Sequence, residues 1–374
     1  MKIAMIGHKR IPSREGGIEI VVGELCSRMA SAGNEVTAYN RKSEHIAGKD
    51  FNTVAANEWN GVKIKWIPTP NRSSLNAIIY SAVATLKAMF GGYDVIHFHA
   101  EGPCSMILLA KLFGKKCVAT IHGLDWQRAK WGGFATKFLK FGERTAARHA
   151  DAVIVLSKNV QEYFKTAYAR KTVFIPNGID KPESEAADII ADKYSLEKDG
   201  YILYLGRLVP EKGVHYLIEA YKKLDTDKKL VIAGGSSHTA EYENELKALA
   251  DGDDRIIFTG FVQGKELGEL YSNAYIYCLP SDLEGMPISL LEAMSFGNAC
   301  LTSDIAECTE VCGDNAVYFR KGDASDLKEK LGCMLSDTDK VRRLKEVSTE
   351  YVCGKYNWDD VTKKTLELYE GLLR

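Results

Sequence analysis

Two carboxylates stand eight positions apart in the second half of this chain, Glu284 and Glu292. Pro287 suits the first position of a helix, where its missing N–H costs no hydrogen bond. We therefore expect Glu284 in the preceding loop and Glu292 inside the helix, with the free N–H groups of Ile288 and Ser289 pointing back toward Glu284. Because a helix N-terminus attracts anions and a carboxylate accepts hydrogen bonds from hydroxyls, this arrangement suits a ligand that is part sugar and part phosphate.

A second segment with binding chemistry runs from Leu205 to Gly213 and follows a short apolar run. Its glycines let the backbone come close to a ligand. Arg207 offers a planar fork of donors and Lys212 a mobile point charge, which together suit a diphosphate. A solvated loop with two incidental cations is the alternative, and it stays open at this point.

In the first half, Gly16 and Gly17 follow the first apolar run and would let a ligand approach the backbone, although a plain tight turn fits them as well. They do not form the dinucleotide fingerprint G-x-G-x-x-G. His122 ends another apolar run, where it could bond a sugar hydroxyl or simply the backbone. We expect His97 and His99 to point to opposite faces of their strand, with His97 structural and the role of His99 open.

Residues 128–148 combine six cations with interleaved aromatic side chains, as in a basic amphipathic helix. Such a helix can lie on an anionic membrane surface. An ordinary helix, with its aromatic residues in the core and its cations in water, explains the pattern equally simply.

Two sets of potential metal ligands are better explained without a metal. Three Asp-x-Asp triplets, at 225–227, 251–253 and 337–339, fall in polar stretches after helical patterns, so we predict surface turns. The nine cysteines form no C-x-x-C pair and have no matching His/Cys pair at zinc-site spacing. We expect reduced, mostly buried thiols in a cytoplasmic protein.

Short apolar runs alternate with helical patterns along the whole chain, which predicts parallel, doubly wound sheets. The pattern restarts after a turn at 175–180, so we predict two Rossmann-like α/β domains, 1–178 and 182–357. The polar stretch 183–197 should be helical, and the last helix, about 358–374, should fold back on the first domain. Ligands of such sheets bind beyond the carboxyl ends of the strands, so we expect the site in an interdomain cleft.

Charge separates the two halves. Residues 1–180 hold 25 Lys and Arg against 14 Asp and Glu, whereas residues 181–374 hold 24 against 36, which gives a basic first half and an acidic second half. The acidic half and the lack of a nucleic-acid motif argue against nucleic-acid binding. We find no pattern typical of a signal peptide and no apolar run long enough for a bilayer. We therefore expect a cytoplasmic protein and, if residues 128–148 contact lipid, a peripheral location on the inner face of the cell membrane.

Five motifs in order along nearly the whole chain resemble the retaining glycosyltransferases of the GT-B fold, in particular family 4. They are the Gly-Gly loop at 16–17, His-Gly at 122–123, Pro-Asn-Gly-Ile-Asp at 176–180, Gly-Arg…Glu-Lys-Gly at 206–213 and the pair Glu284/Glu292. The segment 122–131 further resembles a bacterial subgroup of polysaccharide assembly.

The resemblance implies four catalytic positions. Arg207 and Lys212 would hold the donor diphosphate and stabilise the leaving group, Glu284 would contact the donor sugar and phosphates, and His122 would face the transferred sugar. Glu292 would bond the nucleotide ribose. The other donor-binding positions are Gly16 and Gly17 at the diphosphate, Phe261 and Val262 at the base, and Gly285, Met286, Pro287 and Ile288 at the sugar and phosphates.

The implied donor is a nucleotide-diphosphate sugar, with UDP favoured over GDP. The implied acceptor is a hydroxyl of a saccharide or a polyprenyl-linked saccharide, and no metal or cofactor is implied. Two alternative enzymes remain, as does a protein that binds a nucleotide sugar without catalysis. A retaining glycosidase would use Glu284 and Glu292 as carboxylates about 5 Å apart, which leaves segment 205–213 without a purpose. A nucleotide-sugar epimerase shares the two-domain architecture, but its usual motifs are not apparent.

Overall fold

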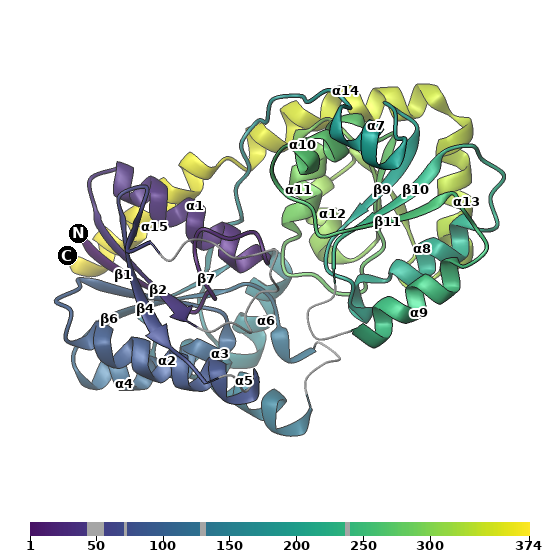
Figure 1. Ribbon diagram of the computed structural model, residues 1–374. Coiled ribbons are helices and arrows are strands. Elements are labelled where there is room, and N and C mark those ends of the chain that lie inside the picture. Colours follow the sequence, from purple (N-terminus) through teal and green to yellow (C-terminus); the bar gives the residue numbers. More distant parts are fainter. Residues whose placement is uncertain (43–55, 71–72, 128–131, 236–239) are drawn as a thin grey trace. The chain divides into compact units, whose positions relative to one another are not determined.

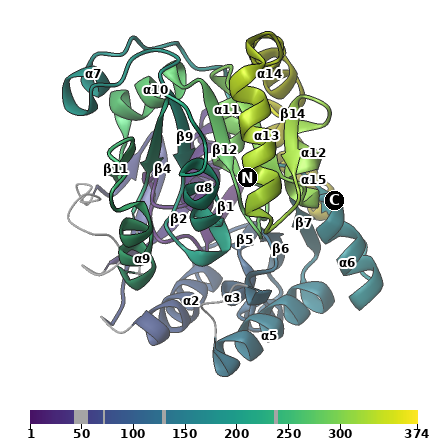
Figure 2. The same cartoon turned by 90° about the vertical axis from the view of Figure 1, so that its right-hand side faces the viewer.

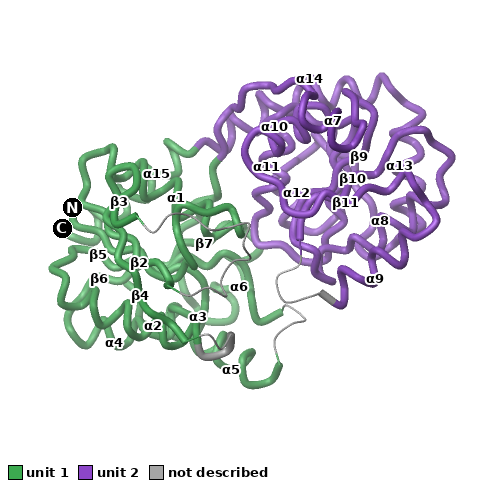
Figure 3. Tube along the Cα trace, viewed as in Figure 1, with its two compact units in different colours: residues 1–178, 358–374 green, residues 179–357 purple. Residues whose placement is uncertain are grey.

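The computed structural model describes residues 1–42, 56–70, 73–127, 132–235 and 240–374 (Figure 1). The chain divides into two compact units (Figure 3). Unit 1 holds Met1–Gly178 together with Trp358–Arg374, and unit 2 holds Ile179–Asn357. The chain therefore leaves unit 1, builds unit 2 and returns for a last helix.

Unit 1 is built on a sheet with strand order β3-β4-β2-β1-β5-β6-β7-β8, parallel except for the β3–β4 pair. Its central strands are almost entirely buried, as expected where helices cover both faces of a parallel sheet. The strands are β1 (Lys2–Ile6), β2 (Glu35–Lys42), β3 (Glu58–Trp59), β4 (Val62–Pro68), β5 (Val95–His99), β6 (Lys116–Ile121), β7 (Ala152–Val155) and β8 (Val173–Phe174).

The helices of unit 1 form two layers (Figure 1). Helices α1 (Gly17–Ser31) and α15 (Trp358–Leu373) pack together on one face. The core cluster lies under the helices of the other face, where Tyr80, Ala110 and Ala146 meet strand residues such as Ile96. That second layer consists of α2 (Ser73–Met89), α3 (Glu101–Cys104), α4 (Ile107–Leu112), α5 (Gly133–His149) and α6 (Lys158–Tyr168), with the short 3-10 helix η2 (Asp125–Gln127) before α5.

Unit 2 is built on a wholly parallel sheet with strand order β11-β10-β9-β12-β13-β14. Helices α8 and α13 pack side by side (Figure 2). The strands are β9 (Tyr201–Leu205), β10 (Lys229–Ala233), β11 (Ile256–Gly260), β12 (Ile276–Leu279), β13 (Ala299–Ser303) and β14 (Ala316–Phe319). The helices are α7 (Ile189–Tyr194), α8 (Val214–Tyr221), α9 (Ala240–Ala250), α10 (Gly264–Asn273), α11 (Ile288–Ser295), α12 (Ala306–Cys312), α13 (Ala324–Ser336) and α14 (Thr338–Lys355), with the 3-10 helix η3 (Pro210–Lys212) before α8.

The predicted pair of doubly wound parallel sheets is confirmed, but two details differ. The stretch 183–197 is helical only over Ile189–Tyr194, because the acidic residues before it have no apolar face to bury and Ser195 ends the helix in a left-handed conformation. Strand β14 was not expected, and neither were the two-residue strands β3 and β8.

Two further properties concern the cysteines and the helices. All nine cysteines are free thiols, and seven of them are buried. Within the described residues, no helix is both long enough and apolar enough to cross a membrane.

Candidate functional site

In unit 2, the loop after β9 and the loop after β12 meet at the centre of the sheet. Strands β9 and β12 are neighbours, and the chain order reverses between them, which is where doubly wound sheets bind ligands. Gly213 closes the first loop at φ +64°, and a Cβ there would lie 2.1 Å from the carbonyl oxygen of Pro280. Because only glycine allows this approach, the sequence locks the Arg207–Lys212 segment against the residues after β12.

The ammonium group of Lys212 lies 2.5 Å from Oε1 of Glu284. Ser281 donates a second hydrogen bond, of 2.7 Å, to the same carboxylate oxygen. The two charged side chains are 14% and 7% exposed, so the pair is mostly shielded from water and its attraction is little screened. The family resemblance predicted that Lys212 contacts a diphosphate and that Glu284 contacts the donor sugar and phosphates. The structure shows that the two side chains also contact each other.

Glu284 precedes helix α11, as the sequence predicted, but the helix begins one residue later than expected. Pro287 occupies the N-cap, and its carbonyl accepts hydrogen bonds from the N–H groups of Leu290 and Leu291. The four residues before and at the helix start are all buried, namely Gly285, Met286, Pro287 and Ile288. The segment therefore presents backbone rather than polar side chains to a ligand.

Glu292 lies inside α11, where its side chain is nearly buried. The Tyr271 hydroxyl from α10 donates a 3.0 Å hydrogen bond to its Oε2. The Tyr271 ring in turn stacks on Phe296, with centroids 5.3 Å apart. Glu292 is thus held in one position by a tyrosine, whereas Glu284 is held by a lysine and a serine, and the two carboxylates have different electrostatic surroundings.

Three other predicted donor residues of unit 2 lie at carboxyl ends of strands. The backbone at Arg207 is fixed because its carbonyl accepts a 3.0 Å hydrogen bond from the hydroxyl of Tyr204. Its side chain is half-buried. Phe261 and Val262 directly follow β11, where Phe261 is half-buried and Val262 is buried.

In unit 1, the candidate residues gather at the neighbouring strands β1, β5 and β6. Gly16 caps α1 with extended backbone, and Gly17 is the exposed first residue of that helix. Gly7 ends β1 at φ +125°, and a Cβ there would lie 2.1 Å from the carbonyl oxygen of His99. This close approach brings the residues that follow β1 against the end of β5.

The predicted His122 does not stand alone, because its Nε2 shares a 3.0 Å hydrogen bond with Nδ1 of His99. Nδ1 of His97 bonds the hydroxyl of Tyr369 at 2.5 Å, and its Nε2 bonds Thr120 at 2.7 Å. The expectation that His97 and His99 point to opposite faces was wrong. Their ring centroids are 4.1 Å apart, since residues two apart on a strand share a face. His97 is structural, as predicted.

Burial keeps three histidines of this region neutral, namely His8, His97 and His99. It lowers the pKa of His97 to about 3, and it lowers the pKa of the nearby His8 to about 4. The pKa of His99 is also lowered well below its usual value, first by burial and then by its histidine neighbours. Nε2 of His99 is buried and makes no hydrogen bond within the described residues. His99 can therefore offer a hydrogen bond to a polar ligand without carrying a charge of its own.

Sequence reasoning missed a pair of buried carboxyl groups beside this histidine group. Glu143 on α5 accepts hydrogen bonds from Trp126 at 2.9 Å, from Tyr163 at 2.9 Å and from Tyr168. Glu101 lies next to it, and burial, followed by the charges of Asp125 and Glu143, raises its pKa. Glu101 is therefore the protonated member, and the pair holds η2, which follows His122, against α5. The signal in the sequence was weak, because the two residues come from different elements.

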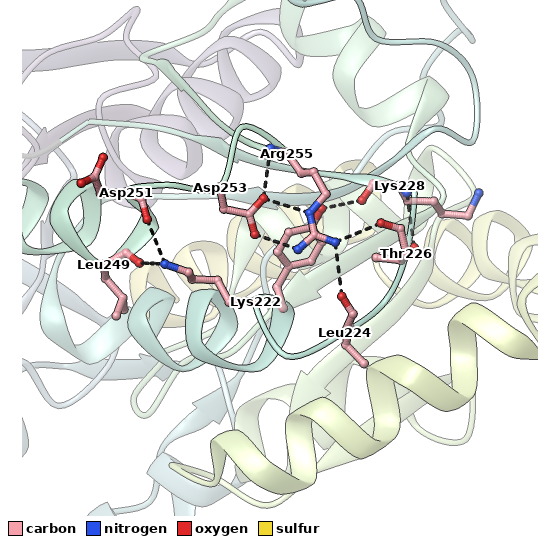
Figure 4. Close-up of polar contacts among 9 residues, drawn as sticks. Lys222, Leu224, Thr226, Lys228, Leu249, Asp251, Asp253 and Arg255 are labelled. Atoms are coloured by element: carbon pink, nitrogen blue, oxygen red, sulfur yellow. Dashed lines mark hydrogen bonds and ion pairs between the residues drawn. The ribbon is translucent and has the colours of Figure 1, made fainter.

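The three Asp-x-Asp triplets serve local structure. Asp253 forms an ion pair with Arg255, whose guanidinium also donates to the carbonyls of Leu224 and Thr226 (Figure 4). The pKa of Asp253 is lowered chiefly by that contact with Arg255. Asp337 caps α14, and no group of three or more potential ligand residues fit for a metal occurs in the described part of the chain.

Comparison with known proteins identifies the family. Residues 15–182 match the family model described as Glycosyltransferase Family 4, and residues 187–351 match the model described as Glycosyl transferases group 1. Alpha-maltose-1-phosphate synthase of Mycolicibacterium smegmatis is 24% identical over 99% of both chains.

Solved structures show the same fold. Sucrose-phosphate synthase of Thermosynechococcus elongatus has a TM-score of 0.85 at 22% identity, with 99% of this chain and 98% of that one covered. Anabaena HepE in complex with UDP and glucose has a TM-score of 0.82 at 18% identity, with 99% and 100% covered. The chain belongs to the family 4 type of glycosyltransferases with the GT-B fold.

Proposed function

We propose that this glycosyltransferase moves a sugar from a nucleotide-diphosphate donor, most simply a UDP-sugar, to a hydroxyl of a saccharide or polyprenyl-linked saccharide. The reaction would retain the anomeric configuration and serve the synthesis of a cell-surface polysaccharide or glycoconjugate. The observation that supports it most is the ion pair that joins Lys212, after β9, to Glu284, in the loop between the neighbouring strand β12 and α11.

The chemistry follows from where charge grows. As the bond between the sugar and the diphosphate breaks, negative charge accumulates on the leaving phosphate oxygens. Arg207, Lys212 and the backbone of Gly285–Ile288 would stabilise that charge without a metal ion. Because Lys212 already contacts Glu284, donor binding would share the ammonium group between the carboxylate and the phosphate. The released carboxylate oxygen could then accept a hydrogen bond from a sugar hydroxyl.

The remaining roles are proposals of the same kind. Glu292 would bond the ribose, Phe261 and Val262 would contact the base, and Gly16 and Gly17 would let the backbone approach the diphosphate. His122 would bond the transferred sugar. For retention, the acceptor oxygen would attack on the face from which the diphosphate leaves, and a departing phosphate oxygen would take the acceptor's proton. Unit 2 would then be the donor-binding domain and unit 1 the acceptor-side domain.

UDP is the first donor to test because Anabaena HepE, which shares the fold, has been captured with UDP and glucose. A thermal-shift series with UDP-, GDP- and ADP-sugars should give the largest stabilisation with one of the UDP-sugars. A larger thermal shift with a GDP-sugar would identify GDP, not UDP, as the nucleotide of the donor, and the proposed reaction class would stand.

Product analysis by NMR then decides the reaction. Transfer to a saccharide hydroxyl with the donor's anomeric configuration supports the proposal, and inversion contradicts retention. Free sugar as the only product from an oligosaccharide would favour the glycosidase alternative. A changed sugar still joined to the nucleotide would favour the epimerase. Adding a chelator should leave transfer unchanged if no metal takes part.

Membrane contact through residues 128–148 and a place in the cytoplasm or on the inner face of the cell membrane are also proposals. Residues 128–131 lie outside the described part of the chain. The rest of the segment forms most of α5.

A further inference from the structure

Most of the exposed apolar side chains belong to one side of unit 1. Among the described residues, eleven large hydrophobic side chains are exposed, and eight of these lie on or directly after α2, α4 and α5. The eight are Ile79, Leu86, Phe90, Leu108, Leu112, Phe113, Phe134 and Phe141. We call their shared surface the three-helix face.

The three helices form a continuous layer. Helix α4 contacts both α2 and α5, and all three cover the same side of the sheet (Figure 1). The ring of Phe90, after α2, packs edge-on against the ring of Phe113, after α4, with centroids 5.9 Å apart. The two aromatic rings thus join neighbouring helices into one apolar surface.

The charge of the three-helix face has a single sign. Its helices carry six cations and one carboxylate, Glu143, which is fully buried under Trp126, Tyr163 and Tyr168. The cations are Lys87, Lys111, Lys137, Lys140, Arg144 and Arg148. One of them, Lys111, is paired with Asp151, which lies outside these helices.

Helix α5 shows the combination most clearly. Phe134, Lys137, Phe141, Arg144 and Arg148 follow one another at spacings of three and four, so they lie along one exposed stripe. On α2, Lys87 lines a shallow hollow together with Leu86 and Phe90. Apolar and cationic side chains are thus interleaved on both helices.

The partner must offer negative charge and an apolar layer at the same surface. A second copy of the chain across a two-fold axis would bring this cationic face against itself, which costs electrostatic energy. A nucleic acid offers phosphates but no apolar layer for the exposed phenylalanines and leucines. An anionic bilayer surface offers both, because its headgroups are acidic and its acyl boundary accepts apolar side chains.

We propose that the three-helix face is the surface on which this protein docks to an anionic lipid membrane. The inference extends the proposed contact from residues 128–148 to α2 and α4, and it depends on neither the donor nor the mechanism of transfer. The phenylalanines and leucines insert at the acyl boundary, while the lysines and arginines lie among the headgroups.

The test is sedimentation of the full chain with lipid vesicles at low salt. Vesicles of phosphatidylcholine and phosphatidylglycerol should retain the protein, whereas vesicles of phosphatidylcholine alone should not. The triple variant Lys137→Gln/Arg144→Gln/Arg148→Gln should weaken partitioning on the order of 100-fold. The variant Phe90→Ser/Phe113→Ser should weaken it about tenfold or more, although it leaves α5 intact.

A matched control carries the same loss of charge elsewhere. Lys223→Gln/Lys363→Gln/Lys364→Gln changes one exposed lysine just after α8 and two exposed lysines of α15, and this variant should bind vesicles like the unmodified protein. The inference is overturned if anionic vesicles do not retain the protein, if this control loses binding equally, or if the Phe90/Phe113 variant binds normally. The inference is also overturned if the unmodified protein is a dimer in gel filtration and the Phe90/Phe113 variant is a monomer. That result would make the three-helix face an interface between two copies of the chain.

Failure of this inference can be told apart from failure of the proposed function. All variants change exposed side chains, so each should keep the nucleotide-induced thermal shift and transfer to a water-soluble acceptor. Loss of vesicle binding with full transfer in solution supports the docking face. Normal vesicle binding without any transfer would contradict the proposed function alone.

Discussion

At the central strands of unit 1 buried histidines are held neutral, whereas at the corresponding strands of unit 2 the candidate side chains form an ion pair. His99 and His122 share a hydrogen bond next to other histidines of lowered pKa, while Lys212 and Glu284 form an ion pair. The charged pair follows β9 and β12, between which the strand order of unit 2 reverses, and the histidine pair lies at the ends of β5 and β6, next to the reversal between β1 and β5. The same architecture thus holds two kinds of polar chemistry. Charges suit a diphosphate, and neutral hydrogen-bonding groups suit the hydroxyls of a sugar.

The largest effect should come from removing the cations of unit 2. Arg207→Ala and Lys212→Ala should each lower turnover by about 10²- to 10³-fold, because each removes a group that stabilises charge growing in the transition state. Steady-state kinetics with a soluble acceptor measure the effect. Lys265→Ala, which removes an exposed cation paired with Asp188 in the same unit, is the matched control. Near-normal turnover of either active-site variant would contradict the assignment of charge chemistry to unit 2.

The next largest effect should come from Glu143 in unit 1, whose buried side chain accepts three hydrogen bonds. Glu143→Gln should lower the free energy of unfolding by about 2–3 kcal/mol, because an amide cannot accept all the hydrogen bonds from Trp126, Tyr163 and Tyr168. Glu101→Gln should be neutral or stabilising at neutral pH. Its raised pKa means that folding at that pH requires proton uptake, which an amide avoids.

Denaturant unfolding followed by tryptophan fluorescence measures both variants. All five tryptophans lie in unit 1, so the signal reports that unit alone. Equal destabilisation by the two substitutions would contradict the raised pKa of Glu101.

The neutral histidines should make unit 1 sensitive to mild acid. His8 and His97 have folded pKa values of about 4 and 3, below the value of 6.5 expected in the unfolded chain. Their stabilising effect is complete above pH 6.5 and is lost as the pH falls, because only the unfolded chain takes up protons there. Each of the two histidines should lower the free energy of unfolding by about 1 kcal/mol between pH 7 and pH 5.5.

The same fluorescence signal, measured from pH 7 to pH 5.5, checks this loss. The exposed His149 provides the control, since His149→Gln should leave the pH dependence unchanged. A flat stability profile over this range would contradict the neutral state of the histidine group.

The smallest expected effect distinguishes the role of His122 from that of His99. His122→Ala should lower transfer by about tenfold or more through the loss of one hydrogen bond to the sugar. His99→Ala should lower it less, because His99 acts through His122 as a positioning residue. His99→Asn offers an amide that can bond His122 and should restore part of the loss in kcat, with little change in the donor KM. An effect of His99→Ala larger than that of His122→Ala would place His99 in direct contact with substrate.

The sequence predicted the elements of the fold better than the contacts among the candidate residues. Runs such as Tyr201–Leu205 and Lys229–Ala233 were predicted to the residue, because buried parallel strands leave a strong apolar signal. The contact between Lys212 and Glu284 joins residues 72 positions apart, and nothing local in either segment encodes it.

The buried pair of Glu101 and Glu143 was missed for a similar reason. Each glutamate alone resembles a surface residue, and only the packing of α3 against α5 removes both from water. The positions of His97 and His99 were a different kind of error. Strand periodicity alone determines that they share a face, so that error was avoidable.

The last helix gives the chain an order of assembly. Helix α15 supplies the Tyr369 hydroxyl that bonds His97, so the histidine region of unit 1 needs residues from both ends of the sequence. During synthesis on a ribosome, all of unit 2 is made before α15 emerges. Unit 2 can therefore fold from one continuous segment, whereas the core of unit 1 is complete only after α15 has been synthesised.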